Sequence, residues 1–147
     1  MLELYTDGSS SGGVGPGGWA FVAYSERGGL LHEAAGGATR TTNNRMEMLA
    51  IAHALRWSAG RECIVYSDSQ LCINTLTQWA PAWAQAGWKK RTPGPIANLD
   101  IVVPAFELFG RSRAIMRWVR GHAGVPGNER ADQLAGEQRL LAMQRAT

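Results

Sequence analysis

Two aspartates directly follow short apolar segments that have the pattern of buried strands. Asp7 follows residues 2–6, and Asp68 follows residues 63–67. In sheets that contain parallel pairs, ligands gather at the carboxyl ends of the strands. If these two strands are neighbours, their backbones lie about 4.8 Å apart and the two carboxylates nearly touch.

Two further acids lie where helices are expected. Glu47 shares one row of an amphipathic helix with Ile51 and Leu55, so it stands at the head of a stripe that faces the core. Asp132 falls in the first turns of a C-terminal helix. A buried carboxylate is unfavourable unless it is paired or bound to a metal ion.

Together these four acids predict a metal site. Two like charges 4 Å apart repel by about 4 kcal/mol at an effective dielectric constant of 20, so the cluster must bind cations or take up protons. Oxygen ligands without a CxxC or HExxH motif favour Mg²⁺ or Mn²⁺ over zinc. Taken singly, each acid also has a structural explanation: a turn residue at Asp7, a helix cap at Asp68, a helix-dipole partner at Asp132 and an exposed helix end at Glu47.

These acids need a sheet that brings their strands together. The first third of the chain is typical of an antiparallel meander, with strands at residues 2–6, 19–25 and 30–36 and a glycine-rich turn after the first. A helix at 44–58 and a buried strand at 63–67 follow. A right-handed crossover places that strand parallel to the first, which makes the sheet mixed.

The second half of the chain is expected to supply the remaining elements. They are helices at 69–78, from Pro81 and at 98–109, a strand at 114–120, and a terminal helix. Pro104 lies well inside the third of these helices, which must kink or start late. Asn128 is expected to cap the terminal helix, whose apolar side is expected to carry Leu134, Ala135, Leu141 and Ala142.

Composition limits the class of protein. A chain of 147 residues with 45% hydrophobic positions fits one compact domain that spans residues 1–147. A net charge of +3 permits a polyanionic partner without demanding one. Cys63 and Cys72 lie in apolar segments without a metal-binding spacing, which favours a reducing, cytoplasmic setting. Because no apolar run approaches bilayer length, we expect no membrane attachment. We also expect the protein to be a monomer.

Short motifs along nearly the whole chain resemble the type 1 ribonuclease H family. They are YTDGS, GPGGW, TRTTNNRMEMLA, SDSQ, TQW, GW and VRGHAGVPGNERAD, in that order. The resemblance implies an α/β fold with a five-stranded mixed sheet of order 3-2-1-4-5, strand 2 antiparallel, and helices on both faces. It also implies an endoribonuclease that cuts the RNA strand of an RNA/DNA hybrid.

By position, Asp7, Glu47, Asp68 and Asp132 are similar to the family's four metal-binding catalytic acids. The resemblance implies two Mg²⁺ ions, with Mn²⁺ as an alternative, that activate the attacking water and stabilise the leaving 3′ oxygen. The implied products carry 5′-phosphate and 3′-hydroxyl ends. His122, in a loop rich in glycine, resembles the family's mobile proton carrier, a role worth about 10²- to 10⁴-fold in rate. The sequence alone equally allows a surface histidine.

Other residues resemble the family's substrate contacts. Amide side chains suit the 2′-hydroxyl groups that distinguish RNA from DNA, and contacts to a phosphate position the duplex without selecting its sequence. The implied contacts are Asn43, Asn44 and Gln70 for the minor groove, Arg40, Thr42 and Asn98 for a DNA-strand phosphate, and Gly8 and Ser9 for the RNA strand. Helix capping is the plainer explanation for Asn43 and Asn44.

Residues 79–95, here called the handle, combine tryptophans with basic residues and are expected to grip the DNA strand. Trp79 and Trp83 are the expected contacts, although at least one tryptophan of the handle is expected to pack on the core. The chain departs from the family pattern at residues 84–86, which are AQA where basic residues are common. Gly13 and Val14 stand where an asparagine and a proline are common.

Two other functions stay open from the sequence. One is a DNA-directed nuclease of the same superfold, since the fold and the metal acids are shared more widely than the substrate. The other is a non-catalytic module that binds hybrids. The TTNNR segment and the His122 loop argue against the first, and the presence of all four acids argues against the second.

Overall fold

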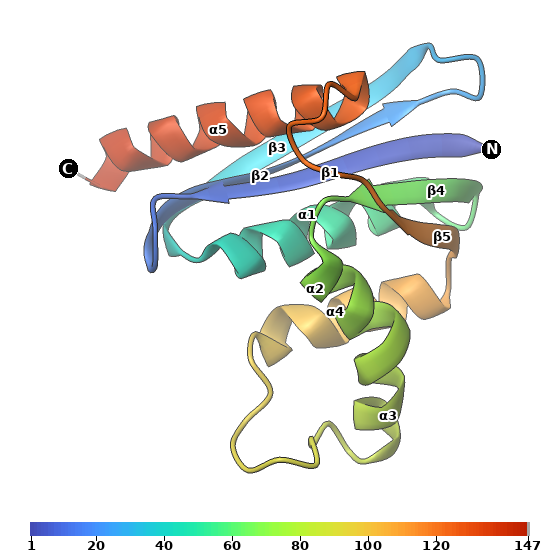
Figure 1. The fold of residues 1–147 in the computed structure, drawn as a ribbon, viewed down its shortest axis with the longest axis vertical. Helices are drawn as coiled ribbons and strands as arrows, with labels where there is room; N and C mark the ends of the chain where they lie inside the picture. The colour runs from blue at the N-terminus through green and yellow to red at the C-terminus, as the bar shows by residue number, and fades with distance from the viewer. Residues whose placement is uncertain (147) are drawn as a thin grey trace.

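The fold is a five-stranded mixed sheet flanked by helices, seen in a computed structural model that describes residues 1–146 (Figure 1). The strand order is β3-β2-β1-β4-β5, with β2 antiparallel to both neighbours and β4 parallel to β1 and β5. The strands are β1 (Leu2–Ser10), β2 (Gly15–Tyr24), β3 (Leu30–Thr41), β4 (Glu62–Ser67) and β5 (Arg113–Trp118). This order confirms the sequence-based prediction.

Helices cover both faces of the sheet. In Figure 1, α5 lies along β1, β2 and β3, whereas α1 lies on the opposite face and is covered in turn by α4. The helical elements are α1 (Asn43–Ser58), α2 (Gln70–Asn74), the π-helical turn η1 (Thr75–Trp79), α3 (Ala80–Gln85), α4 (Leu99–Gly110) and α5 (Pro126–Ala146). The handle projects away from the sheet between η1 and α4.

The parallel pairing of β1 with β4 sets the register of the candidate site. Tyr5 pairs with Tyr66, so Asp7 and Asp68 lie level with each other two residues further on. β1 does not end before Asp7, as its pattern predicted, because it continues to Ser10 as the partner of β2. The two aspartates therefore meet where β1 leaves β4.

Two glycines let helices lie very close to the sheet. A Cβ atom at Gly8 would lie 2.4 Å from the backbone nitrogen of Glu47, and one at Gly18 would lie 2.2 Å from the carbonyl oxygen of Ala135. In a close-packed interior, separations this short exclude a larger residue unless the backbone moves. The start of α1 and the middle of α5 are thus fixed against β1 and β2.

Three helices differ from the sequence-based expectation. Thr42, not Asn44, caps α1, because its hydroxyl accepts a hydrogen bond from the backbone N–H three residues later. α5 begins at Pro126, a residue that suits a first helical turn, so the prediction of Asn128 as its cap is wrong. The helix expected at 69–78 changes to π-helical geometry in its second half.

The terminal helix buries small side chains. Ala131, Ala135 and Ala142 are fully buried, whereas Leu141, which was expected on the apolar side, is exposed. Small residues on this face allow the close approach of α5 to the sheet. Pro104 lies inside α4 on its exposed side, so the helix neither starts late nor ends there.

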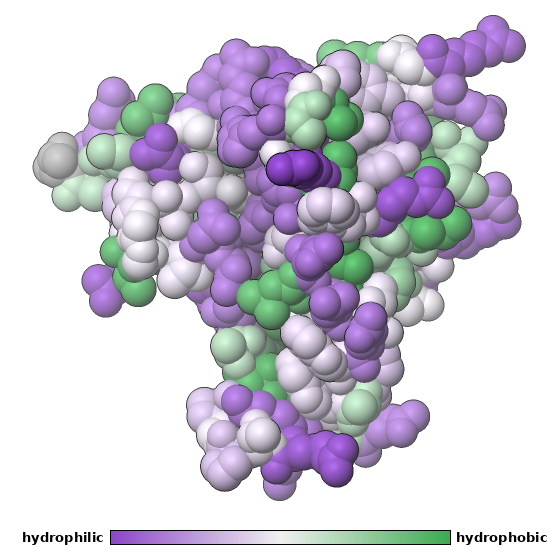
Figure 2. Space-filling model, in the orientation of Figure 1, coloured by the Kyte–Doolittle hydropathy of each residue, from purple (hydrophilic) through white to green (hydrophobic). Residues whose placement is uncertain are grey.

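The surface is mixed in polarity. In Figure 2, hydrophilic residues cover the loop that leads into α5 and the tip of the handle, and apolar residues gather over α2 at the base of the handle. Leu71 and Trp79 are among the large exposed apolar residues of that region. Within the part of the chain that the structure describes, no helix is both long and apolar enough to cross a bilayer.

Candidate active site

Three carboxylates meet where β1 leaves β4. Asp7 comes from β1, Asp68 from the residue after β4, and Glu47 from the second turn of α1. One oxygen atom from each residue lies within 4.8 Å of the others. Asp7 and Glu47 are each only 4% exposed, so most of the cluster is withdrawn from water.

Backbone constraints place these side chains. The register of β1 against β4 brings Asp7 beside Asp68. The lack of a side chain at Gly8 lets the backbone of Glu47 lie against β1. The Thr42 cap fixes where α1 begins and therefore which of its residues reaches the sheet. The register of β1, the glycine and the helix cap together thus bring the three acids to one place.

Burial and mutual repulsion raise the pKa values of the two buried acids, Asp7 and Glu47. Burial is the largest cause that raises the pKa of Asp7 to about 8, and Asp68 and Asp132 add to it, while a hydrogen bond with Glu47 opposes it. The pKa of Glu47 is also raised well above its ordinary value, first by burial and then by Asp68 and Asp7. Such a group takes up protons at neutral pH unless cations neutralise it.

The donor set fits a divalent cation that prefers oxygen ligands. All the converging atoms are carboxylate oxygens. Oε1 of Glu47 is buried and has no hydrogen-bond partner among the described residues. Because a buried anionic oxygen without a partner is strongly unfavourable, a bound cation is its natural counterpart.

Asp132 lines the same pocket from α5, although it stands outside the cluster of three. Two contacts hold the start of α5 in place. A Cβ atom at Gly127 would lie 2.3 Å from the ring of Tyr5, and Arg130 donates hydrogen bonds of 2.6 and 3.0 Å to the carboxylate of Glu33 on β3. These contacts keep Asp132 close enough to Asp7 to affect its protonation.

His122 lines this pocket from the loop between β5 and α5, with its side chain exposed. Its backbone has a φ of 56°, in the left-handed region that non-glycine residues rarely adopt. At the preceding Gly121, a Cβ atom would lie 2.8 Å from Oδ2 of Asp68. The loop is therefore held against the acids, while the imidazole stays accessible to solvent.

Several predicted substrate contacts surround the acids. Those that line the acid pocket are Gly8, Ser9 and Asn43. Ser10, which was not among the predicted contacts, also lines the acid pocket. Together with Thr42 and Asn44 it lines an open groove that adjoins this pocket. Gln70 is exposed at the start of α2, and Arg40 is exposed near the end of β3. Neither of these two lines the acid pocket.

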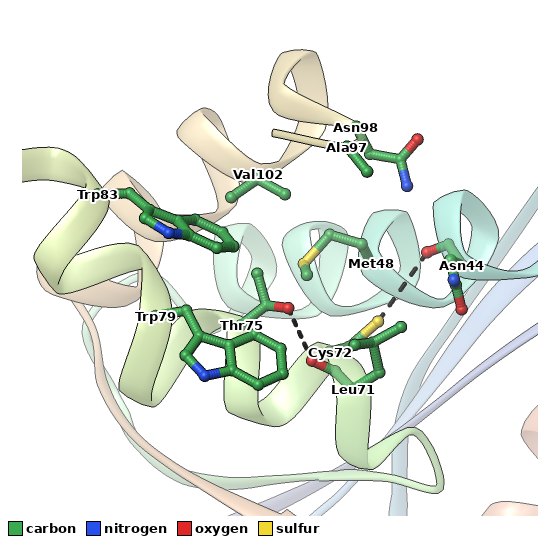
Figure 3. A pocket seen from close by; sticks show the side chains of 10 residues that line it. All are labelled: Asn44, Met48, Leu71, Cys72, Thr75, Trp79, Trp83, Ala97, Asn98 and Val102. Carbon is green, nitrogen blue, oxygen red and sulfur yellow. Dashed lines mark hydrogen bonds between the residues drawn. The ribbon is translucent and has the colours of Figure 1, made fainter. Parts of the chain in front are cut away.

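A second pocket joins the handle to α1 (Figure 3). Trp79 and Trp83 stand on one side of it, and Asn44 and Asn98 stand on the other. The two indole rings are 6.3 Å apart between centroids and tilted by 35°. Trp79 is 40% exposed, whereas Trp83 is half-buried against the core, as is Trp88. The structure thus brings four predicted substrate contacts into one pocket.

Arg45 is a residue of this region that the sequence analysis missed. Its guanidinium donates hydrogen bonds of 2.9 and 2.8 Å to the carboxylate of Asp100 and one of 3.3 Å to Oδ1 of Asn98. It therefore ties the start of α1 to the start of α4, which positions Asn98 beside the second pocket. The partner Asp100 lies 55 residues away, so no local pattern marks this pair.

Comparison with known proteins agrees with this arrangement. The family model of RNase H matches residues 1–139. The ribonuclease H of Pseudomonas entomophila is 41% identical over 136 residues, which cover 91% of this chain and 90% of that protein, and the ribonuclease H of Paramagnetospirillum magneticum is 43% identical over 138 residues, which cover 92% and 88%. A solved structure of the N-terminal RNase H domain of a Mycobacterium tuberculosis protein is 26% identical, with a TM-score of 0.77 and coverage of 99% of this chain and 98% of that one. With the matched residues spanning the sheet and every acid of the pocket, the chain belongs to the ribonuclease H family.

Proposed function

We propose that this protein hydrolyses the RNA strand of RNA/DNA hybrids and leaves 5′-phosphate and 3′-hydroxyl ends. The observation that carries the proposal is the cluster of Asp7, Glu47 and Asp68, in which a buried oxygen of Glu47 has no hydrogen-bond partner among the described residues. The name ribonuclease H of relatives that are 41% and 43% identical supports the choice of substrate.

Asp7, Glu47, Asp68 and Asp132 are proposed to hold two Mg²⁺ ions, or Mn²⁺ in their place, when the hybrid is bound. Bound there, the ions supply activation of the attacking water and stabilisation of the leaving 3′ oxygen. The chain's own contribution is to fix four carboxylates from separate elements before the substrate arrives. Such preorganisation avoids rearrangement during the reaction.

His122 is proposed to carry a proton at the acid pocket, either from the attacking water or to the leaving oxygen. Its exposed ring and its loop position beside Asp68 suit a group that approaches and withdraws. General acid–base catalysis requires that the group reach the proton within hydrogen-bond distance in the substrate complex, and the free protein need not show this contact.

Replacing His122 by alanine is therefore expected to lower turnover by about 10²- to 10⁴-fold while hybrid affinity stays nearly unchanged. Turnover at saturating hybrid and binding by fluorescence anisotropy separate the two effects. His32→Ala is the matched control, since His32 stacks on Trp57 away from the acid pocket. A His122 variant that turns over normally but binds weakly would exclude the proton-carrier role.

The hybrid is proposed to lie across both pockets. Asn43 and Ser9 would contact the RNA strand at the acid pocket, with Gln70 reaching its 2′-hydroxyl groups. Trp79 and Asn98 would contact the DNA strand at the second pocket. The first turn of α1 contains no acidic residue, so the positive end of its helix dipole favours a phosphate between the two pockets.

Alanine at Trp79 and alanine at Trp83 are expected to have different effects on hybrid binding and on thermal stability. Trp79→Ala should weaken hybrid binding by about tenfold, because stacking on an exposed indole contributes about 1–3 kcal/mol, and it should leave thermal stability nearly unchanged. Trp83→Ala should instead lower stability, because this ring packs on the core. Anisotropy titrations and thermal unfolding of both variants test this difference, and unchanged affinity in the Trp79 variant would refute its role as a stacking platform.

One assay separates the proposal from its rivals. RNA/DNA, RNA/RNA and DNA/DNA duplexes of equal sequence are each incubated with Mg²⁺ and with a chelator. We expect cleavage of the RNA strand of the hybrid alone, and only with Mg²⁺. Cleavage of DNA/DNA would indicate a DNA-directed nuclease, and tight hybrid binding without cleavage would indicate a non-catalytic module.

A further inference from the structure

Arg139 on α5 lies beside the end of β1. Its Nε donates a hydrogen bond of 3.1 Å to the hydroxyl of Ser9, and its Nη1 donates one of 3.4 Å to the hydroxyl of Ser11. Nη1 also lies 3.7 Å from the sulfur of Met143. All three partners are neutral, and none of the ion pairs formed within residues 1–146 includes Arg139. Its positive charge is thus left without an anionic partner.

The close approach of α5 to β2 brings Arg139 to this position. Gly18 pairs with Ser9 across the β1–β2 ladder. A Cβ atom at Gly18 would lie 2.8 Å from the backbone nitrogen of Arg139, so any other residue would push the helix away. Because the helix backbone lies directly over this pair, the guanidinium reaches the segment between Ser9 and Ser11.

One of the two serines that Arg139 contacts, Ser9, lines the acid pocket. Ser9 and the adjacent Ser10 line that pocket together with four carboxylates, and Ser10 also lines the open groove that leads away from it. Carboxylates repel the phosphates of a strand that crosses them. A phosphate that leaves the acids along Ser9 and Ser10 would meet the guanidinium, which is suited to bidentate binding of phosphate.

We propose that Arg139 binds a phosphate of the RNA strand beside the acid pocket, an inference that rests on the proposed cleavage of hybrids. The RNA strand is the one concerned because its scissile phosphate must lie at the acids, whereas the second pocket, on the handle side of α1, is assigned to the DNA strand. Arg139 is thus a substrate-binding residue that offsets repulsion by the acids and takes no part in bond cleavage.

The test is an Arg139→Gln variant titrated with a labelled RNA/DNA hybrid in a chelator, at several salt concentrations between roughly 50 and 200 mM. Loss of one phosphate contact should weaken binding by about 3- to 10-fold at the lowest salt and reduce the slope of log affinity against log salt by about one. Arg145→Gln is the matched control, since it removes the same charge from the last turn of the same helix, where the guanidinium of Arg145 lies beside Gly37 on β3. It should keep the wild-type slope.

Two further variants separate binding from support of the fold. Arg139→Lys should restore most of the salt slope, because it keeps the charge, and Ser11→Ala should keep it as well. A wild-type slope in Arg139→Gln, or weaker binding that appears only together with a lower unfolding temperature, would overturn the inference. If the wild-type protein neither binds nor cleaves hybrids, the proposed function fails as well, so the wild-type titration distinguishes the two failures.

Discussion

Replacing Asp68 by asparagine is expected to abolish cleavage of an RNA/DNA hybrid while the protein stays folded. Asp68 offers one of three oxygens that converge within 4.8 Å, and an amide supplies no negative charge to a divalent cation. A bound metal ion contributes several kcal/mol to transition-state stabilisation, which corresponds to a loss of about 10³-fold or more in rate. Turnover in Mg²⁺ and circular dichroism of the same sample measure the two expectations together.

The control for this variant lies at the other end of β4, the strand that leads to Asp68. Glu62 begins β4 and forms an exposed ion pair with Arg113, far from the acid pocket. Glu62→Gln also neutralises one carboxylate and should keep wild-type turnover, since exposed ion pairs contribute little. Turnover in Asp68→Asn within tenfold of wild type would remove Asp68 from the metal site and, with it, the proposed mechanism.

The placement of Asp7 beside Asp68 was predictable from the sequence for a physical reason. Alternating and continuous apolar patterns distinguish half-buried from buried strands, and the right-handed crossover rule then leaves few ways to arrange them. The meander, the helix at 44–58 and the buried strand after it therefore predict that β4 runs parallel to β1, and the resemblance to the ribonuclease H family implied that the two are neighbours, as they are in the structure. Glu47 could be singled out because a carboxylate interrupts an otherwise apolar helical row.

The remaining features depend on contacts between distant segments, which no local pattern encodes. Gly8 and Gly18 look like flexible loop residues in the sequence, yet each removes a side chain where a helix crosses the sheet. The predicted apolar side of α5 is confirmed at Ala135 and Ala142, which are buried, and wrong at Leu141, which is exposed, because the close approach of that helix leaves space only for small side chains. The hydrogen-bonded pair of Arg45 with Asp100 is another contact between distant segments that no local pattern encodes.

The position of Asp132 depends both on the local sequence pattern and on contacts between distant segments. Its position early in a helix was visible in the sequence, but its distance from Asp7 depends on how α5 docks. Docking in turn rests on Gly127 against Tyr5 and on the pair of Arg130 with Glu33. The structure accordingly places Asp132 in the acid pocket but outside the tight cluster of Asp7, Glu47 and Asp68.

In the absence of metal, the protein is expected to lose stability as pH rises from about 4 to about 8, and Asp7→Asn is expected to remove much of that loss. Burial raises the folded-state pKa of Asp7 to about 8 and that of Glu47 well above its ordinary value. In the unfolded chain both values return to about 4. Between these limits the folded protein binds more protons than the unfolded chain, so this stability is fully present below about pH 4 and is lost as pH rises through the folded pKa.

The free energy of unfolding by urea, measured in a chelator over this pH range, tests the expectation. Near pH 8, the free energy of unfolding of Asp7→Asn should exceed that of wild type by about 1–3 kcal/mol, because the variant removes one of several buried charges that repel each other. His53 has the opposite effect on stability, because burial lowers its pKa and its contribution to stability is lost as pH falls below about 6.5. This contribution is the same in wild type and in Asp7→Asn, so it cancels when the two free energies of unfolding are subtracted. Mg²⁺ should stabilise wild type more than the variant near pH 8, because a cation that binds only the folded state shifts the equilibrium toward it. Parallel pH curves for the two proteins would mean that neither burial nor repulsion raises the pKa of Asp7 in the folded protein, and the case for cations at this site would fail.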